Sequence, residues 1–352
     1  MRRNPGQVAL AGLCLLLAAF LFDTAPLFVA GTALLVLAVG AGAWIQLSAR
    51  GVTVQRGPLP PRVVESEPVE ATIEVKAGPL GAPGATLLDP LAGGPLPVRA
   101  ASPVHLVARF GRRGRVVLAA PGLRLQDPLG LARIEVMGSR GAELLVLPRT
   151  EPVRWASPDG DARGRGEGLA GARQPPTVVE VDGLRPYQPG TPASRIYWAA
   201  LARGADLLER RLEADVDARP LVVLDARSGG PDRQLDAAVR AAASLTLELA
   251  RGGGCRLLLP DERRATAIEA DLAAWPAVHA RLAVVESAVR APALPPDASL
   301  VLYVAAQPLE PAGAGVLVLP EDVLGPPGAR PCLEVAGCRG YRLARTPMRR
   351  AA

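Results

Sequence analysis

The chain has 352 residues, enough for about two domains of ordinary size. Hydrophobic residues make up 49% and charged residues 21%, which excludes a mostly disordered chain, and four cysteines are too few for a disulfide scaffold. The net charge of +6 comes from arginines scattered among 34 acidic residues, so the sequence shows no basic patch and predicts no nucleic-acid partner.

Two apolar segments open the chain. Residues 8–22 are apolar without interruption, and residues 25–47 are apolar again after Asp23 and Thr24. Because a membrane-spanning helix needs about 20 apolar residues, we predict a two-helix transmembrane anchor over residues 1–50. The alternatives are a secretory signal peptide, a signal anchor or a re-entrant first segment. No small-residue cleavage motif follows the first segment, which counts against the signal peptide.

The charges that flank these segments predict an orientation. Arg2 and Arg3 precede the first segment, Arg50 and Arg56 follow the second, and the connection between them carries only Asp23. Because basic flanks stay in the cytoplasm, we predict two spans of the plasma or inner membrane with both termini and the soluble domains cytoplasmic. The lipid bilayer is then the first partner of the chain.

The region 51–150 has the pattern of a β-sandwich of about 100 residues. Short segments alternate between apolar and polar positions and are separated by Gly/Pro turns, which is typical of strands with one buried face. The predicted strands are residues 52–54, 69–75, 105–107 and 116–118. Residues 79–97 are rich in Gly and Pro and are predicted to form an exposed loop.

Residues 151–215 form a predicted connector. Its first part contains a polar, Gly-rich segment, residues 159–168. A helix is predicted over residues 191–204, with Thr191 as N-cap and Gly204 at its end.

This helix carries Arg195, Trp198 and Arg203, an unusual set in a chain with 3% aromatic residues. One interpretation is that Trp198 anchors the helix to a sheet while the arginines pair with nearby acids. The other is that the three residues contact a ligand.

The region 216–345 has an α/β, Rossmann-like pattern. Continuous apolar segments alternate with helical ones, which predicts a parallel sheet buried on both faces. Strands are predicted at 221–225, 255–259, 282–285, 299–305 and 315–319, and helices at 232–251 and 265–280. Ligands of such sheets bind at the carboxyl ends of the strands, and Asp225 lies at one such end.

Six motifs follow one another between residues 110 and 225. They are Arg113-Gly114-Arg115, Asp127-Pro128-Leu129-Gly130-Leu131, Leu145-Val146-Leu147-Pro148-Arg149, Leu184 to Gly190 with Tyr187, Arg195-Ile196-Tyr197-Trp198 with Arg203, and Leu224-Asp225. In order and spacing they resemble the family called domain of unknown function 58. The resemblance assigns motif or interaction roles to Asp127, Gly130, Tyr187, Gly190, Arg195, Trp198, Arg203 and Asp225. The chain has Thr191 and Tyr197 where the family commonly has an acid and a His or Asp.

The resemblance implies a membrane-tethered bacterial protein whose region 216–345 is a von Willebrand factor A-like domain. Such proteins are commonly encoded near MoxR-type AAA+ ATPases and often near transglutaminase-like membrane proteins. Their proposed role is protein interaction in the assembly or activation of other proteins, not enzymatic catalysis. We therefore expect a MoxR-type ATPase as partner and a transglutaminase-like protein as a second candidate.

A von Willebrand A domain binds a divalent metal through a DxSxS loop, because a hard cation prefers carboxylate and hydroxyl oxygens. Residues 225–229 here are Asp-Ala-Arg-Ser-Gly, so Arg227 and Gly229 replace the two serines. The prediction is a degenerate loop without a cofactor, in which Asp225 pairs with Arg227 or caps the next helix. The alternative is a Mg²⁺ site with Asp225 and Ser228 as its ligands.

Catalytic signals are weak in this sequence. His105 and His279, the only histidines, belong to no nucleophile motif such as GxSxG, and we expect the chain not to be an enzyme. Two other hypotheses stay open. One is a structural envelope-assembly protein without an ATPase partner, and the other is a hydrolase that relies on carboxylates such as Asp215 and Asp217.

Overall fold

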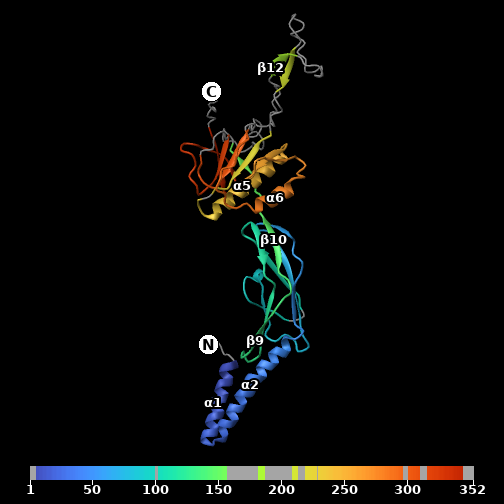
Figure 1. The fold of residues 1–352 in the computed structure, drawn as a ribbon, viewed down its shortest axis with the longest axis vertical. Helices are drawn as coiled ribbons and strands as arrows, with labels where there is room; N and C mark the ends of the chain where they lie inside the picture. The colour runs from blue at the N-terminus through green and yellow to red at the C-terminus, as the bar shows by residue number, and fades with distance from the viewer. Residues whose placement is uncertain are drawn as a thin grey trace. The chain divides into compact units, whose positions relative to one another are not determined.

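The chain folds into two compact units, Met1–Val146 and Leu147–Ala352 (Figure 1). The computed structural model describes residues 5–99, 102–156, 181–186, 208–212, 219–227, 229–295, 300–309 and 315–343, with 181–186 and 208–212 as backbone only. Each unit has hydrophobic core clusters of its own.

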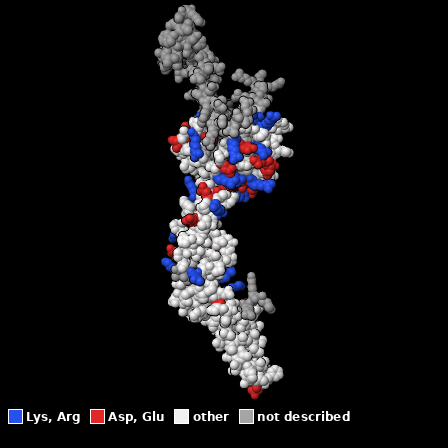
Figure 2. Space-filling view, turned by 180° about the vertical axis from the view of Figure 1, so that it is seen from behind, with Lys and Arg blue, Asp and Glu red and all other residues white. Residues whose placement is uncertain are grey.

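The first unit begins with a helical hairpin of α1 (Pro5–Phe22) and α2 (Ala25–Ala49). Both helices are long and apolar enough to cross a membrane, which confirms the predicted pair of apolar helices. Figure 2 shows no charged side chain on this hairpin except at the connection between the helices, where Asp23 adopts a positive φ of 50°. The orientation in a membrane stays a prediction.

The two helices approach each other closely at Gly12 and Gly31. A Cβ atom on Gly31 would lie 2.8 Å from the carbonyl oxygen of Gly12 and 2.8 Å from Cγ of Leu16. Small residues at such crossings let helix backbones pack without side chains between them. The glycine at position 31 is therefore required by the packing of the hairpin.

A strand-rich body with several sheets follows. Its hydrogen-bonded strand orders are β1-β3-β6, β2-β10-β7 and β5-β4-β8-β9. The strands are β1 (Thr53–Arg56), β2 (Arg62–Val64), β3 (Pro68–Lys76), β4 (Thr86–Leu88), β5 (Leu96–Pro97), β6 (Val104–Arg109), β7 (Gly114–Leu118), β8 (Gly122–Gln126), β9 (Arg133–Met137) and β10 (Ala142–Leu147). Strand β3 shows why the alternation forms a core, because Val69, Ala71, Ile73 and Val75 are buried and the residues between them face outward.

The prediction of an exposed loop over residues 79–97 is wrong. This segment contains β4, β5 and the short 3₁₀ helix η1 (Pro90–Ala92), and Leu87 is fully buried. Strand β4 pairs with β8, so the segment completes a sheet. Most of the Gly and Pro residues lie in turns between these short elements. The apolar residues between the turns are the ones that pack into the core.

The last turns of α2 share the core of the strand-rich body. Ala41 and Ile45 are buried in the same cluster as Val54 and Leu125. Only three residues separate α2 from β1, and Val52 N–H donates to the carbonyl oxygen of Ala49 across this junction. Helix α2 therefore enters the body as a packed part of it.

The second unit is built on a sheet of order β11-β19-β20-β18-β17-β14-β15-β16. Its elements are β11 (Arg154–Trp155), β14 (Leu221–Asp225), α5 (Asp232–Arg251), β15 (Cys255–Leu258), β16 (Thr266–Ile268), α6 (Trp275–Ala283), β17 (Val301–Ala305), β18 (Val316–Pro320), β19 (Pro331–Val335) and β20 (Cys338–Arg342). A separate antiparallel pair consists of β12 (Val181–Pro186) and β13 (Leu208–Leu212).

The sheet is mixed, so the prediction of a parallel sheet holds only for its centre. Strands β15, β14, β17 and β18 run parallel and are buried along their whole length. The strands outside this group pair antiparallel. The described residues do not establish the von Willebrand A-like fold.

Helices α5 and α6 pack on the same face of this sheet (Figure 1). The prediction of a helix at 232–251 is confirmed, and Leu245 of α5 lies in one cluster with Val222 and Leu224 of β14. The opposite face carries Leu221, Val223 and Tyr303, which pack with side chains from loops.

The predicted helix at 265–280 is confirmed only for residues 275–280, and the predicted strand at 282–285 is wrong. Residues 266–268 form β16, which pairs with β15 and buries Ile268. Helix α6 begins at Trp275, because Pro276 suits the first turn of a helix but interrupts one that is already running. Leu282 is then one turn after Val278 on the buried side of α6.

Strands β19 and β20 form a hairpin that the sequence analysis did not predict. Ala336 and Gly337 connect them with φ angles of 48° and 74°, and two consecutive positive φ angles are typical of a tight hairpin turn. Two predicted features lie outside the described residues, namely the Gly-rich segment 159–168 and the helix at 191–204.

Candidate functional site

The candidate site lies at the carboxyl ends of the parallel strands of the second unit. Asp225 is the last residue of β14 and is fully buried. Val223 lies opposite Tyr303 of β17 in the parallel register, so Asp225 and Tyr303 point to the same face of the sheet. The hydroxyl of Tyr303 donates a hydrogen bond of 2.6 Å to Oδ2 of Asp225.

Arg227 supplies the other partners of this carboxylate. Its backbone N–H donates to Oδ1 of Asp225 at 2.9 Å, its Nε lies 3.1 Å from the same oxygen, and its Nη2 donates to Oδ2 at 2.6 Å. The Arg227 side chain is 30% exposed and the Asp225 side chain is buried. A fork of this kind is the strong form of the arginine–carboxylate pair.

The protonation states follow from these contacts. The hydrogen bond to Asp225 raises the pKa of Arg227 above its usual value, and burial only partly opposes this effect. Burial, followed by the hydrogen bond to Asp225, raises the pKa of Tyr303. Tyr303 is therefore a neutral donor and Arg227 a permanent cation at physiological pH. Both side chains are therefore hydrogen-bond donors to the oxygens of Asp225.

Polar groups from neighbouring elements surround the cluster. The backbone N–H of Gly229 donates to Oε1 of Gln307, after the end of β17, at 3.3 Å. Nε of Arg233 lies 3.4 Å from Oδ2 of Asp322, and Nε2 of Gln234 donates to the same oxygen at 3.3 Å. The strand ends and the first turn of α5 thus form an edge of mixed charge.

The described residues at this edge do not fit a divalent cation. Both oxygens of Asp225 already accept hydrogen bonds, and Arg227 places a positive charge where a metal would need a ligand. Ser228 lies outside the described residues, so the alternative Mg²⁺ site stays untested. Within the part of the chain that the structure describes, no three His, Cys, Asp or Glu residues gather in a way that could hold a metal. The contacts of Asp225 include the expected pairing with Arg227.

The predicted motif residues that the structure describes belong to two different units. Asp127 and Gly130 belong to the first unit, and Asp225 belongs to the second. The remaining predicted residues lie outside the described part of the chain: Tyr187, Gly190, Arg195, Trp198 and Arg203.

Asp127 organises the turn between β8 and β9. Its Oδ2 accepts the N–H of Leu129 at 2.9 Å, and its Oδ1 accepts the N–H of Ala132. Gly130 adopts a φ of 68°, a conformation that favours glycine, and its N–H donates to the carbonyl oxygen of Asp127. The motif at 127–131 is thus a structural turn in which the Asp and the Gly have defined roles.

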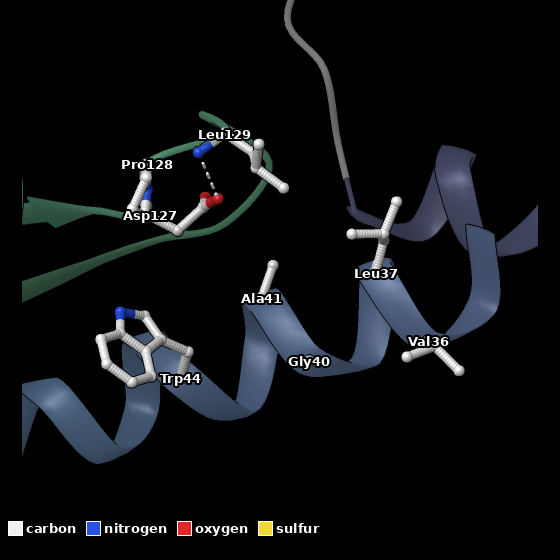
Figure 3. Close-up of a pocket in the computed structure, with 8 residues that line it drawn as sticks. All are labelled: Val36, Leu37, Gly40, Ala41, Trp44, Asp127, Pro128 and Leu129. Carbon is white, nitrogen blue, oxygen red and sulfur yellow. Dashed lines mark hydrogen bonds between the residues drawn. The ribbon is translucent and has the colours of Figure 1, made fainter. Parts of the chain in front are cut away.

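This turn lies beside α2, and the two line an open apolar pocket of about 260 Å³ (Figure 3). In Figure 3, Leu37 and Ala41 point from α2 toward the side of the turn. The lining residues are Val36, Leu37, Gly40, Ala41, Trp44, Asp127, Pro128 and Leu129.

The two histidines occupy unlike positions. Nδ1 of His105 lies 3.3 Å from Oγ1 of Thr72 on the surface of the first unit. His279 is buried in the second unit, where its Nε2–H donates to the carbonyl oxygen of Pro148 at 2.7 Å and its ring stacks on Trp275. Burial lowers the pKa of His279, and the hydrogen bond to Pro148 partly opposes this effect.

Tyr303 was not predicted as a residue of the site. A signal was present, because Tyr303 is the only residue with a polar group in the aliphatic segment 301–305. Its closeness to Asp225 depends on the pairing of β14 with β17, which was not predicted.

No model of a protein family matches the chain, and no curated protein is significantly similar to it. The resemblance to the domain of unknown function 58 family therefore depends on the motifs alone.

Proposed function

We propose that the chain is a membrane-anchored interaction protein that works with a MoxR-type AAA+ ATPase in the assembly or activation of other proteins. The junction of α2 with the strand-rich body carries this proposal. Ala41 and Ile45 of an apolar helix are buried in the core of a folded unit, so a span through the bilayer would fix that unit at the membrane surface. A signal peptide that is removed would take part of this core with it.

The strand-end edge of the second unit is the proposed docking surface. Arg227 is partly exposed there, and Arg233, Gln234 and Asp322 add polar groups of both signs. Mixed charge at an interface favours specific pairing over general adhesion. In this proposal the unit is a von Willebrand A-like platform whose metal is replaced by the Asp225–Arg227 ion pair, and the strand-rich body is a β-sandwich module.

Co-purification tests the proposal. The full chain is isolated from membranes in mild detergent with a non-hydrolysable ATP analogue and Mg²⁺, and retained proteins are identified by mass spectrometry. We expect an AAA+ ATPase that is retained only in the ATP-like state. Retention of no AAA+ protein under these conditions would contradict the proposal.

Two arginines form a matched pair of variants for this experiment. The side chains of Arg233 and Arg115 are 77% and 72% exposed. Each forms a surface ion pair, Arg233 with Asp322 at 3.4 Å and Arg115 with Glu143 at 3.6 Å. Exposed ion pairs of this kind contribute little to stability. We expect Arg233→Glu to reduce ATPase retention several-fold and Arg115→Glu, on β7, to leave it unchanged. Equal retention by both variants would exclude the strand-end edge as the docking surface.

A further inference from the structure

The turn of residues 127–132 lies against a part of α2 well before the end of that helix. Helix α2 has 25 residues and is about 37 Å long. A hydrocarbon core about 30 Å thick that begins at Asp23 would extend about 20 residues along α2, to about residue 44. The pocket that the turn shares with α2 is lined on the helix by residues between Val36 and Trp44, the part of the helix that this core would surround.

Four N–H groups of the turn are hydrogen-bonded within the turn and do not depend on water. In a bilayer, backbone N–H and C=O groups must be satisfied within the protein. The N–H groups of Leu129 and Ala132 donate to the Asp127 carboxylate, and that of Gly130 donates to the Asp127 carbonyl oxygen. The N–H of Asp127 donates to the carbonyl oxygen of Ala132, and Pro128 has no N–H.

The outer surface of the turn is apolar. Pro128 and Leu129 are exposed, Leu129 by 54%, while Asp127 is buried with its oxygens directed to the backbone (Figure 3). On α2 the pocket continues over Val36, Leu37 and Trp44. Trp44 lies near the calculated edge of the hydrocarbon core, where Trp is favoured.

We infer that the β8–β9 turn is a second membrane-contacting element, and that an acyl chain of a bilayer lipid fills the pocket between this turn and α2. The inference depends on the proposed membrane anchorage of α1 and α2. It adds that the folded body also enters the bilayer, with Pro128 and Leu129 at the depth of the upper acyl chains. The membrane-contacting surface of the protein then includes part of the motif at residues 127–131.

Spin labels on the full chain test the inference. The protein is reconstituted in vesicles of phosphatidylethanolamine and phosphatidylglycerol, and the accessibility of each label to oxygen and to a water-soluble nickel complex is compared. The parent variant is Cys14→Ala/Cys332→Ala. Cys255 and Cys338 stay in place, because both are buried and burial raises their pKa to about 12.

The label at Leu129→Cys is compared with two exposed control positions, Leu17→Cys on α1 and Val117→Cys on β7. We expect the oxygen-to-nickel ratio at 129 to match that at 17 and to exceed that at 117 several-fold. Pro128→Cys is a second label in the turn and should give the same result.

The controls separate failure of this inference from failure of the anchor. A water-like ratio at both 128 and 129 with a lipid-like ratio at 17 would overturn the inference and leave the anchor intact. A water-like ratio at 17 as well would overturn both, since a turn cannot enter a bilayer that its helices do not enter.

Discussion

The Asp225 carboxylate shows how one neighbouring side chain sets the chemistry of a strand end. The guanidinium of Arg227 lies directly on this carboxylate. The negative charge of the carboxylate is thus paired with a cation of the same chain. Tyr303, on the neighbouring strand β17, donates a further hydrogen bond to this carboxylate.

A double-mutant cycle tests this ion pair. We expect Arg227→Ala to lower the free energy of unfolding by about 2 to 3 kcal/mol, because it leaves a buried carboxylate without its cation. We expect a smaller loss than for a fully buried ion pair, because the Arg227 side chain is 30% exposed. Urea denaturation followed by tryptophan fluorescence measures it.

Asp225→Asn in the Arg227→Ala background should recover part of the loss, since the uncompensated charge is then gone. Arg233→Ala is the control and should change stability by less than about 0.5 kcal/mol. An Arg227→Ala variant as stable as the control would show that the pair does not stabilise the unit.

His279 gives a prediction for pH dependence. Its folded pKa lies below the ordinary value of 6.5, so the unfolded chain binds more protons in the interval between the two values. The contribution of His279 to stability is complete above about pH 6.5 and decreases as the pH falls toward the folded pKa.

Unfolding of the wild type and of His279→Gln at about pH 7.5 and about pH 5 measures this contribution. Glutamine can keep a donor toward the Pro148 carbonyl and does not titrate. We expect a smaller acid destabilisation in the variant. Equal pH dependence in both proteins would assign the acid sensitivity to other groups.

At the scale of elements, the crossing of α1 and α2 is the most sensitive contact of the hairpin. We expect Gly31→Val to destabilise the first unit by about 1 to 3 kcal/mol, because its side chain would meet the backbone of Gly12. Gly42→Val is the matched control on the same helix, since a Cβ there has no neighbour within 4 Å. Unfolding midpoints in one detergent compare them, and equal midpoints would exclude a tight crossing.

The elements also show what the sequence could predict. The helix at 232–251 was predictable because its apolar stripe, the proline before it and the glycines after it agree. The segment 265–285 was not, because its local pattern suits a helix while pairing with β15 makes residues 266–268 a strand. In the site, Asp225 was predictable from its place at a strand end, but its bond with Tyr303 depends on strand order, which local patterns do not contain.

For the whole molecule, the flanking charges predict that both units lie in the cytoplasm. A reporter fused after Ala352 tests this expectation, since alkaline phosphatase is active only outside the cytoplasm and a fluorescent protein fused there is active inside. We expect fluorescence without phosphatase activity. The same reporters fused after Asp23, between α1 and α2, should give the opposite result, and equal signals at both positions would contradict a two-span anchor.

The order of the strands in the second unit has a consequence for synthesis on the ribosome. Strand β11 is the first of this sheet in the chain, yet its partner is β19, one of the last. A nascent chain must therefore keep residues 154–155 unpaired until residues 331–335 have left the exit tunnel. The first unit closes its own core long before that point. We expect the first unit to be folded and anchored in the membrane while the edge of the second unit still lacks β19. During this interval the unpaired edge strand would be accessible to a chaperone.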